Sequence, residues 1–217
     1  MHGIHDLGGV QNFGPVPHRV NEYPDGPFQT AEYHEDWEPL AYGLLFACAD
    51  ADQFSVDQLR HSIERMEPRD YMTSSYFERI LVGTATLMVE NGMLTQEELE
   101  DLAGGPFPLS RPVSSAGRPA NPNLQQFEVG DRVRVATEQV PGHIRVPGYC
   151  FGKEGVIDHR TAHEWRFPDA IGHGRDDGGS EPTYHVRFDA TDVFGTDTEA
   201  ESIVVDLFGG YLEPVPA

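Results

Sequence analysis

The spacing of apolar residues divides the chain into a helical part and a strand part. From residue 37 to about residue 102, apolar side chains recur every three or four positions, which is the spacing of a buried helix face. Beyond residue 125 apolar and polar residues alternate, with Val129, Val133 and Val135 marking one run. Alternation with a period of two is typical of a strand that has one face buried.

Three capping boxes mark where helices begin. In each, a Ser or Thr side chain and a Glu or Gln three residues later satisfy free backbone N–H groups. The pairs are Ser55 with Gln58, Ser75 with Glu78, and Thr95 with Glu98. We expect Pro68 to end the first of these helices and Gly92 to end the second. The apolar run EPLAYGLLFACA predicts a further, buried helix before them.

The irregular segments lie at the N-terminus and between the two parts. The first 36 residues combine Gly and Pro turn signals with scattered apolar side chains. A disordered tail lacks such residues, so the segment either wraps a partner or lies along the core of its own chain. We prefer an extended arm that wraps a partner. Residues 104–125 are rich in Pro, Gly and Ser and are interpreted as a linker.

The strand part contains four runs: FEVGDRVRV, EGVIDH, TYHVRF and SIVVDLFGGYLEPV. Short strands separated by Gly, Asp and Pro clusters suggest a small SH3-like antiparallel β-barrel. The predicted fold class is therefore α+β. The predicted domains are the arm (1–36), a helical domain (37–103), the linker (104–125) and the barrel (126–217).

Composition narrows the classes of function. The formal net charge is −21, from 15 Lys and Arg against 36 Asp and Glu. Repulsion from phosphates makes nucleic acid an improbable partner. The sequence has no run of 18 apolar residues and no basic segment followed by an apolar core, so we expect a cytoplasmic location. Cys48 and Cys150 are expected to be reduced thiols.

The common catalytic motifs do not occur. His159 and His163 are four residues apart, but DHRTAHEWRFPDAIGHG reads as a loop and H-E-x-x-H is missing. The segment GKEG lacks the spacing of a phosphate-binding loop, and no serine stands in G-x-S-x-G. We therefore expect this chain to hold no metal or cofactor and to have no catalytic centre of its own.

Two arginines remain unusual. Arg60 lies beside Leu59, close to an apolar helix face, and Arg145 stands in the glycine-rich segment PGHIRVPGYCFGKEG. One interpretation is that both are surface arginines or members of local ion pairs. The other is that their guanidinium groups bind an oxyanion, which arginine does better than lysine. No such oxyanion is evident on this chain, so it would belong to another chain.

Several phrases in order resemble the β subunit of nitrile hydratase, nearly end to end. They are MHGIHDLGGVQNFGPV, FSVDQLRHSIERMEPRDYM, LMVENGMLTQEELE, PGHIRVPGYCFGKEG and VVDLFGGYLEPV. The resemblance implies an enzyme that hydrates nitriles to amides as an αβ heterodimer or an α2β2 heterotetramer. It implies non-haem iron or non-corrin cobalt in the α subunit, held by cysteines of which two are oxidised. The form of the segment around Arg145 is similar to the iron-dependent branch.

The resemblance also implies roles for individual residues. Arg60 and Arg145 would hydrogen-bond the oxidised cysteines across the interface. Four side chains would line the substrate pocket: Tyr42, Leu45, Phe46 and Tyr76. Departures from the family occur at Gly148 and Phe151, where basic residues are common, and at Ile80, where an aromatic residue is common. These changes suggest a wider pocket.

Two alternatives remain open from the sequence. A subunit of thiocyanate hydrolase looks similar in architecture, but that family normally splits the helical and barrel parts into separate chains. The other alternative is a non-catalytic SH3-like interaction or metallochaperone module.

Overall fold

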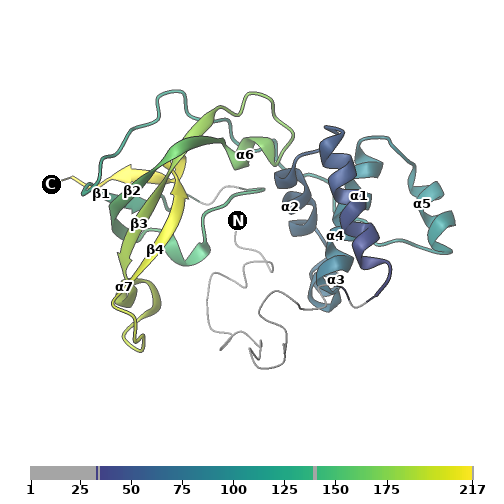
Figure 1. Ribbon diagram of the computed structural model, residues 1–217, viewed down its shortest axis with the longest axis horizontal. Coiled ribbons are helices and arrows are strands. Elements are labelled where there is room, and N and C mark those ends of the chain that lie inside the picture. Colours follow the sequence, from purple (N-terminus) through teal and green to yellow (C-terminus); the bar gives the residue numbers. More distant parts are fainter. Residues whose placement is uncertain (1–32, 34, 139–140, 217) are drawn as a thin grey trace, which may run out of the picture.

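The computed structural model describes residues 33, 35–138 and 141–216. Most of the predicted arm, residues 1–36, lies outside the described residues. Figure 1 shows the helices gathered on one side of the molecule and the sheet on the other, with α2 and α6 between them. The predicted α+β class is confirmed. No helix in the described part of the chain has the length and apolar character to cross a membrane.

The helical part contains five helices, and the capping boxes are confirmed at three of them. Their bounds are α1 (Glu38–Asp50), α2 (Val56–Glu64), α3 (Pro68–Thr73), α4 (Tyr76–Glu90) and α5 (Gln96–Ala103). Reciprocal side-chain and backbone hydrogen bonds form the boxes at α2, α4 and α5. The prediction for Pro68 was wrong, because α2 already ends at Glu64 and Pro68 begins α3. Proline suits the first turn of a helix, where its missing N–H costs nothing.

Helices α1, α2 and α4 form one hydrophobic core. Its buried members are Leu45, Cys48, Phe54, Leu59, Ile80 and Leu87. Gly83 brings α2 and α4 together, because a Cβ at this position would lie 2.8 Å from Ile63 Cγ1 and from Ser62 Oγ.

The strand part is a five-stranded antiparallel sheet. Its strands are β1 (Arg132–Val135), β2 (Glu154–Arg166), β3 (Ser180–Asp189), β4 (Ser202–Phe208) and β5 (Leu212–Pro214). Their order is β4-β3-β2-β1-β5, and each pair of neighbouring strands is antiparallel. The described pairings leave β4 and β5 as the two edges, so the sheet is open and a closed SH3-like barrel is not confirmed.

Three details of the strand prediction were wrong. Val129 precedes β1 and is exposed, because the strand begins at Arg132. His159 and His163 lie within β2 rather than in a loop. The long terminal run forms two strands, β4 and β5, separated by the 3₁₀ helix η4 (Gly209–Tyr211). The turn signals that suggested a loop, Pro168, Gly172 and Gly174, come after β2. Pro168 begins the helix α6 (Pro168–Ile171), and the two glycines follow that helix.

The helical part meets the sheet part through α2. Ser55 Oγ lies 3.5 Å from the carbonyl oxygen of Ile171, and His61 Nδ1 lies 2.9 Å from that of Gly172. The predicted linker also contacts both parts. Arg111 binds Glu67 with Nε–Oε1 2.6 Å, and Arg118 Nε lies 2.7 Å from Asp169 Oδ2.

Candidate functional site

The candidate site lies at this junction and contains both unusual arginines. Arg60 projects from α2, whose start is fixed by the capping box of Ser55. Its Nη1 lies 2.7 Å from Oδ1 of Asp57, one turn earlier, and 44% of the side chain is exposed. The local ion pair expected as one interpretation of Arg60 is therefore present. No second ion pair of this guanidinium group occurs among the described residues.

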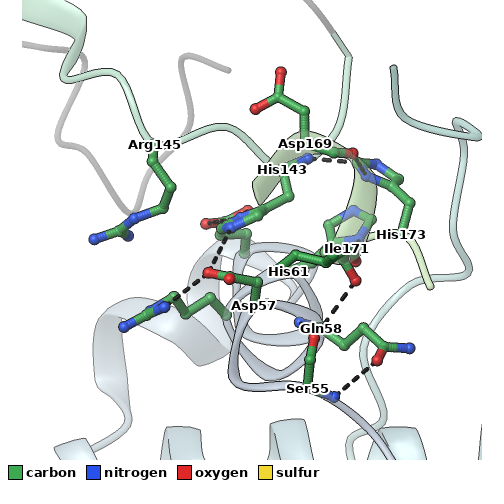
Figure 2. A network of polar contacts seen from close by, with 12 residues as sticks. Ser55, Asp57, Gln58, His61, His143, Arg145, Asp169, Ile171 and His173 are labelled. Atoms are coloured by element: carbon green, nitrogen blue, oxygen red, sulfur yellow. Dashed lines mark hydrogen bonds and ion pairs between the residues drawn. The ribbon is translucent and has the colours of Figure 1, made fainter. Parts of the chain in front are cut away.

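Arg145 lies in the segment that follows β1 and passes over α2. Its backbone N–H donates to the hydroxyl of Tyr211 at 3.0 Å. The side chain is exposed, and the structure gives it no ion pair among the described residues. Figure 2 shows its side chain at the left of the cluster, without a dashed contact. The Arg145 backbone is thus held while its guanidinium group is presented outward.

His143 connects the segment of Arg145 to the helix of Arg60. Its side chain is fully buried. Nδ1 lies 2.9 Å from Glu64 Oε1, and Nε2 lies 3.4 Å from Asp57 Oδ1, the same oxygen that binds Arg60. Both ring nitrogens therefore face carboxylates, which requires the imidazolium form with two N–H donors.

The electrostatics of this pair of carboxylates favour a charged His143. Burial alone would lower the pKa of His143, but hydrogen bonds and charge from Asp57 and Glu64 raise it above its ordinary value. Burial likewise acts to raise the pKa of Asp57, but His143 and Arg60 outweigh burial and lower it. The result is a chain of alternating charges from Glu64 through His143 and Asp57 to Arg60.

Two further histidines beside His143 are neutral. Burial, followed by the neighbouring His173, lowers the pKa of His61 to about 3. Burial also lowers the pKa of His173. His173 Nδ1 lies 2.7 Å from the carbonyl oxygen of Asp169, so it donates there and Nε2 can accept from the His143 backbone N–H at 3.4 Å. The histidine cluster in Figure 2 therefore contains one positive charge.

A second buried network supports Arg145 from the sheet side. The Tyr211 hydroxyl lies 2.5 Å from Asp169 Oδ1, and Asp169 Oδ2 binds Arg118 at 2.7 Å. The Asp169 side chain is 1% exposed, so the guanidinium of Arg118 balances a charge that would otherwise be buried alone. Arg60 and Arg145 are thus held by separate hydrogen-bond networks. Both networks include the short segment from His143 to Arg145.

The four predicted pocket residues lie in the helical part, but they differ in exposure. Leu45 is buried in the helical core, Tyr42 is half-buried, and Phe46 and Tyr76 are exposed by 46% and 59%. Tyr42 and Phe46 make an edge-to-face contact at 4.9 Å between ring centroids. Burial, then a hydrogen bond with Tyr42, raises the pKa of Tyr76. The structure therefore groups Tyr42, Phe46 and Tyr76 and places Leu45 behind them.

Sequence reasoning missed most of the supporting residues. They are Asp57, Glu64, Arg118, His143, Asp169 and Tyr211. Asp57 and Glu64 stand three residues before and four residues after Arg60, and this helical spacing was a usable signal. Phe77 was also missed, although its ring lies 5.9 Å from Tyr42 and 5.1 Å from Tyr76.

The chemistry available here is donation of hydrogen bonds to an anion. No group of three or more His, Cys, Asp or Glu suited to a metal ion occurs among the described residues. Arg60 and Arg145 are exposed and held from behind, which suits oxyanions on another chain. Fold and site thus define an α+β chain that presents arginines at its surface.

Comparisons with known proteins assign this class to a family. The model for the N-terminal part of the nitrile hydratase beta subunit matches residues 1–121, and that for its C-terminal part matches residues 115–214. The chain belongs to the nitrile hydratase β-subunit family.

Relatives of full length agree with this family. A nitrile hydratase subunit beta of Rhodococcus erythropolis is 61% identical over 215 residues, which cover 99% of each chain. One of Pseudomonas chlororaphis is 48% identical over 217 residues, covering 100% of this chain and 97% of the relative. A cobalt-containing nitrile hydratase subunit beta of Pseudonocardia thermophila is 31% identical over 237 residues, covering 99% and 97%.

Proposed function

We propose that this chain is the β subunit of a nitrile hydratase and acts with an α subunit to hydrate nitriles to amides. The observation behind this proposal is the pair of exposed arginines, each supported by a buried network, in a chain that matches the family over its whole length. The complex would be an αβ heterodimer or an α2β2 heterotetramer.

The metal belongs to the α subunit in this proposal. When bound there, non-haem iron or non-corrin cobalt supplies Lewis-acid polarisation of the nitrile. Arg60 and Arg145 donate hydrogen bonds to the oxidised cysteine ligands and balance their negative charge. Donors held at fixed positions also orient such ligands. We prefer iron, because the segment PGHIRVPGYCFGKEG around Arg145 is similar to that of the iron-dependent branch.

The pocket in this proposal is lined by the four side chains on α1 and α4. Tyr42, Phe46 and Tyr76 supply aromatic surface to the nitrile substituent, and Leu45 supports them from the core. The Tyr76 hydroxyl, whose pKa is raised by burial and by a hydrogen bond with Tyr42, orients the substrate by a hydrogen bond. Ile80 lies behind them on α4 and is 6% exposed, so its smaller size would affect the pocket through packing.

The test is co-expression with the α subunit, followed by assays of amide formation and metal content. Arg60→Lys and Arg145→Lys keep the charge but lose the planar fork. We expect each to lower activity by roughly 10- to 100-fold, which is usual when a group that orients metal ligands is changed. Arg187→Lys is the matched control, because Arg187 is equally exposed and contacts Asp158 through one nitrogen at 3.2 Å.

The outcomes separate the alternatives. Activity and about one metal per αβ pair in the complex, with neither in this chain alone, would support the proposal. Metal or activity in the isolated chain would contradict the absence of a catalytic centre here. Unchanged activity in both lysine variants would remove the role of the arginines, and an inert, metal-free complex would favour a binding module.

A further inference from the structure

We propose that Tyr211 is a positioning residue for Arg145, which it holds in place through the backbone rather than through the guanidinium group. The inference rests on the proposed function, because Arg145 acts on a group of the α subunit. Tyr211 lies 66 residues after Arg145, at the end of η4, and only 2% of it is exposed.

The first support is the position of the Tyr211 ring. It packs against Phe167 and Phe208, with centroids 5.7 Å and 6.1 Å away, in the hydrophobic core of the sheet. A ring fixed on two sides by other rings has little freedom to move. The hydroxyl is therefore a fixed point of the sheet domain, at which the Arg145 backbone N–H is held at 3.0 Å.

The second support is the direction of the hydrogen bonds. An ionised carboxylate accepts only, so the Tyr211 proton must point to Asp169 Oδ1 at 2.5 Å. An oxygen lone pair then remains for the Arg145 N–H. Burial raises the pKa of Asp169, and Arg118, 2.7 Å from the other carboxylate oxygen, acts against burial and favours the ionised form. The direction of each hydrogen bond is thus fixed along the series from Arg118 through Asp169 and Tyr211 to the Arg145 backbone.

The third support is the geometry of the segment itself. His143 is fixed to α2 through Glu64 and Asp57, and two residues later the Arg145 backbone is fixed to Tyr211. The long arginine side chain begins at this second point, so a small backbone shift there displaces the guanidinium group. Misplacement by about 1 Å can cost an enzyme about 100-fold in rate.

The experiment replaces Tyr211 with Phe in the αβ complex. This substitution keeps the packed ring and removes only the hydroxyl. Tyr184→Phe is the matched control, because Tyr184 lies in the same core, is 0% exposed, and its hydroxyl also accepts from a backbone N–H, that of Phe127 at 3.3 Å. Both variants lose one hydroxyl and one acceptor, but only Tyr211 contacts Arg145.

We expect Tyr211→Phe to lower kcat by about 10-fold with little change in KM, the lower end for a group that orients ligands. We expect Tyr184→Phe to leave both constants near those of the wild type. Amide hydrogen exchange supplies a readout independent of activity: protection at Arg145 should fall in Tyr211→Phe alone. Arg118→Gln, which keeps the hydroxyl but removes the ion pair with Asp169, should lower kcat in the same direction and by less.

Three results would overturn the proposal: equal kcat in the two Phe variants, unchanged protection at Arg145, or a loss of kcat that follows metal content alone. A wild-type complex that hydrates no nitrile would instead overturn the proposed function. In that case the exchange measurement would still decide whether Tyr211 holds Arg145.

Discussion

The buried charge on His143 allows a quantitative prediction. His143→Leu removes the imidazolium group and leaves the carboxylates of Glu64 and Asp57 facing an apolar side chain. Breaking a buried ion pair from one side costs about 3–5 kcal/mol. Asp57 keeps its contact with Arg60, and the two carboxylate side chains are 8% and 16% exposed. We therefore expect the lower end, about 3 kcal/mol.

The assay is thermal unfolding of the αβ complex at a fixed concentration. For a chain of this size about 1 kcal/mol shifts Tm by about 2–4 °C, so His143→Leu should lower Tm by about 6–12 °C. The double variant His143→Leu with Glu64→Leu no longer buries an unpaired carboxylate at position 64. It should therefore be more stable than the single variant. The double-mutant cycle should give a coupling energy between the two sites of about 1–3 kcal/mol.

The pH dependence gives a second check on the same network. The pKa of His143 is raised in the folded state, so its stabilisation is fully present below the ordinary value of 6.5 and is lost as pH rises through the raised value. Asp57 and Glu64 face the ring nitrogens, and neutral His61 and His173 lie beside the ring. The Tm difference between wild type and His143→Leu should therefore narrow in alkaline solution. A Tm loss below about 2 °C, or a difference that widens with pH, would refute the reasoning.

Two other predictions concern the same junction and the sheet core. Gly142→Ala and Gly130→Ala both add a Cβ where the backbone φ is positive, at +102° and +97°. The Cβ at residue 142 would lie 2.1 Å from His173 Nε2, whereas the Cβ at residue 130 would meet no atom within 4 Å. Gly142→Ala should lower both Tm and activity, whereas Gly130→Ala should show only the backbone cost of about 1–2 kcal/mol; equal losses would contradict the close approach to His173. Burial raises the pKa of Cys150 to about 12, so a thiol reagent at pH about 8 should leave it unmodified until the protein unfolds. Mass spectrometry of the peptide that contains Cys150, before and after denaturation, measures this, and rapid native labelling would contradict it.

The helices could be predicted because their signals are local. Each capping box joins residues three positions apart, as in Ser75 and Glu78. Pro68 misled the prediction because a proline that cannot continue one helix can equally begin the next. In the sheet, β2 continues past its expected end because β3 pairs with it as far as Arg166 and Ser180, a long-range pairing that turn residues nearby do not reveal.

The candidate site was only half predictable for the same reason. Arg60 and Arg145 emerged as unusual residues, and the family resemblance implied their role. Their supports join residues far apart in the chain: His143 and Glu64 are separated by 79 positions, and Tyr211 and Asp169 by 42. The spacing of apolar and polar residues along the sequence does not reveal contacts between residues so far apart. The charge of His143 follows from the tertiary fold, since a histidine in a glycine-rich segment looks the same whether buried or exposed.

The attachment of the linker bears on whether the two parts of the protein need a continuous chain. Arg111 is fastened to the helices through Glu67, and Arg118 is fastened to the sheet through Asp169. The residues between them are 112–117, and four of these, 112–114 and 116, are exposed. A break in the coding sequence there would leave each half with its own piece of the linker and with its side of the contact between α2 and α6. We therefore expect the two halves, expressed as separate polypeptides, to keep the surface that joins them.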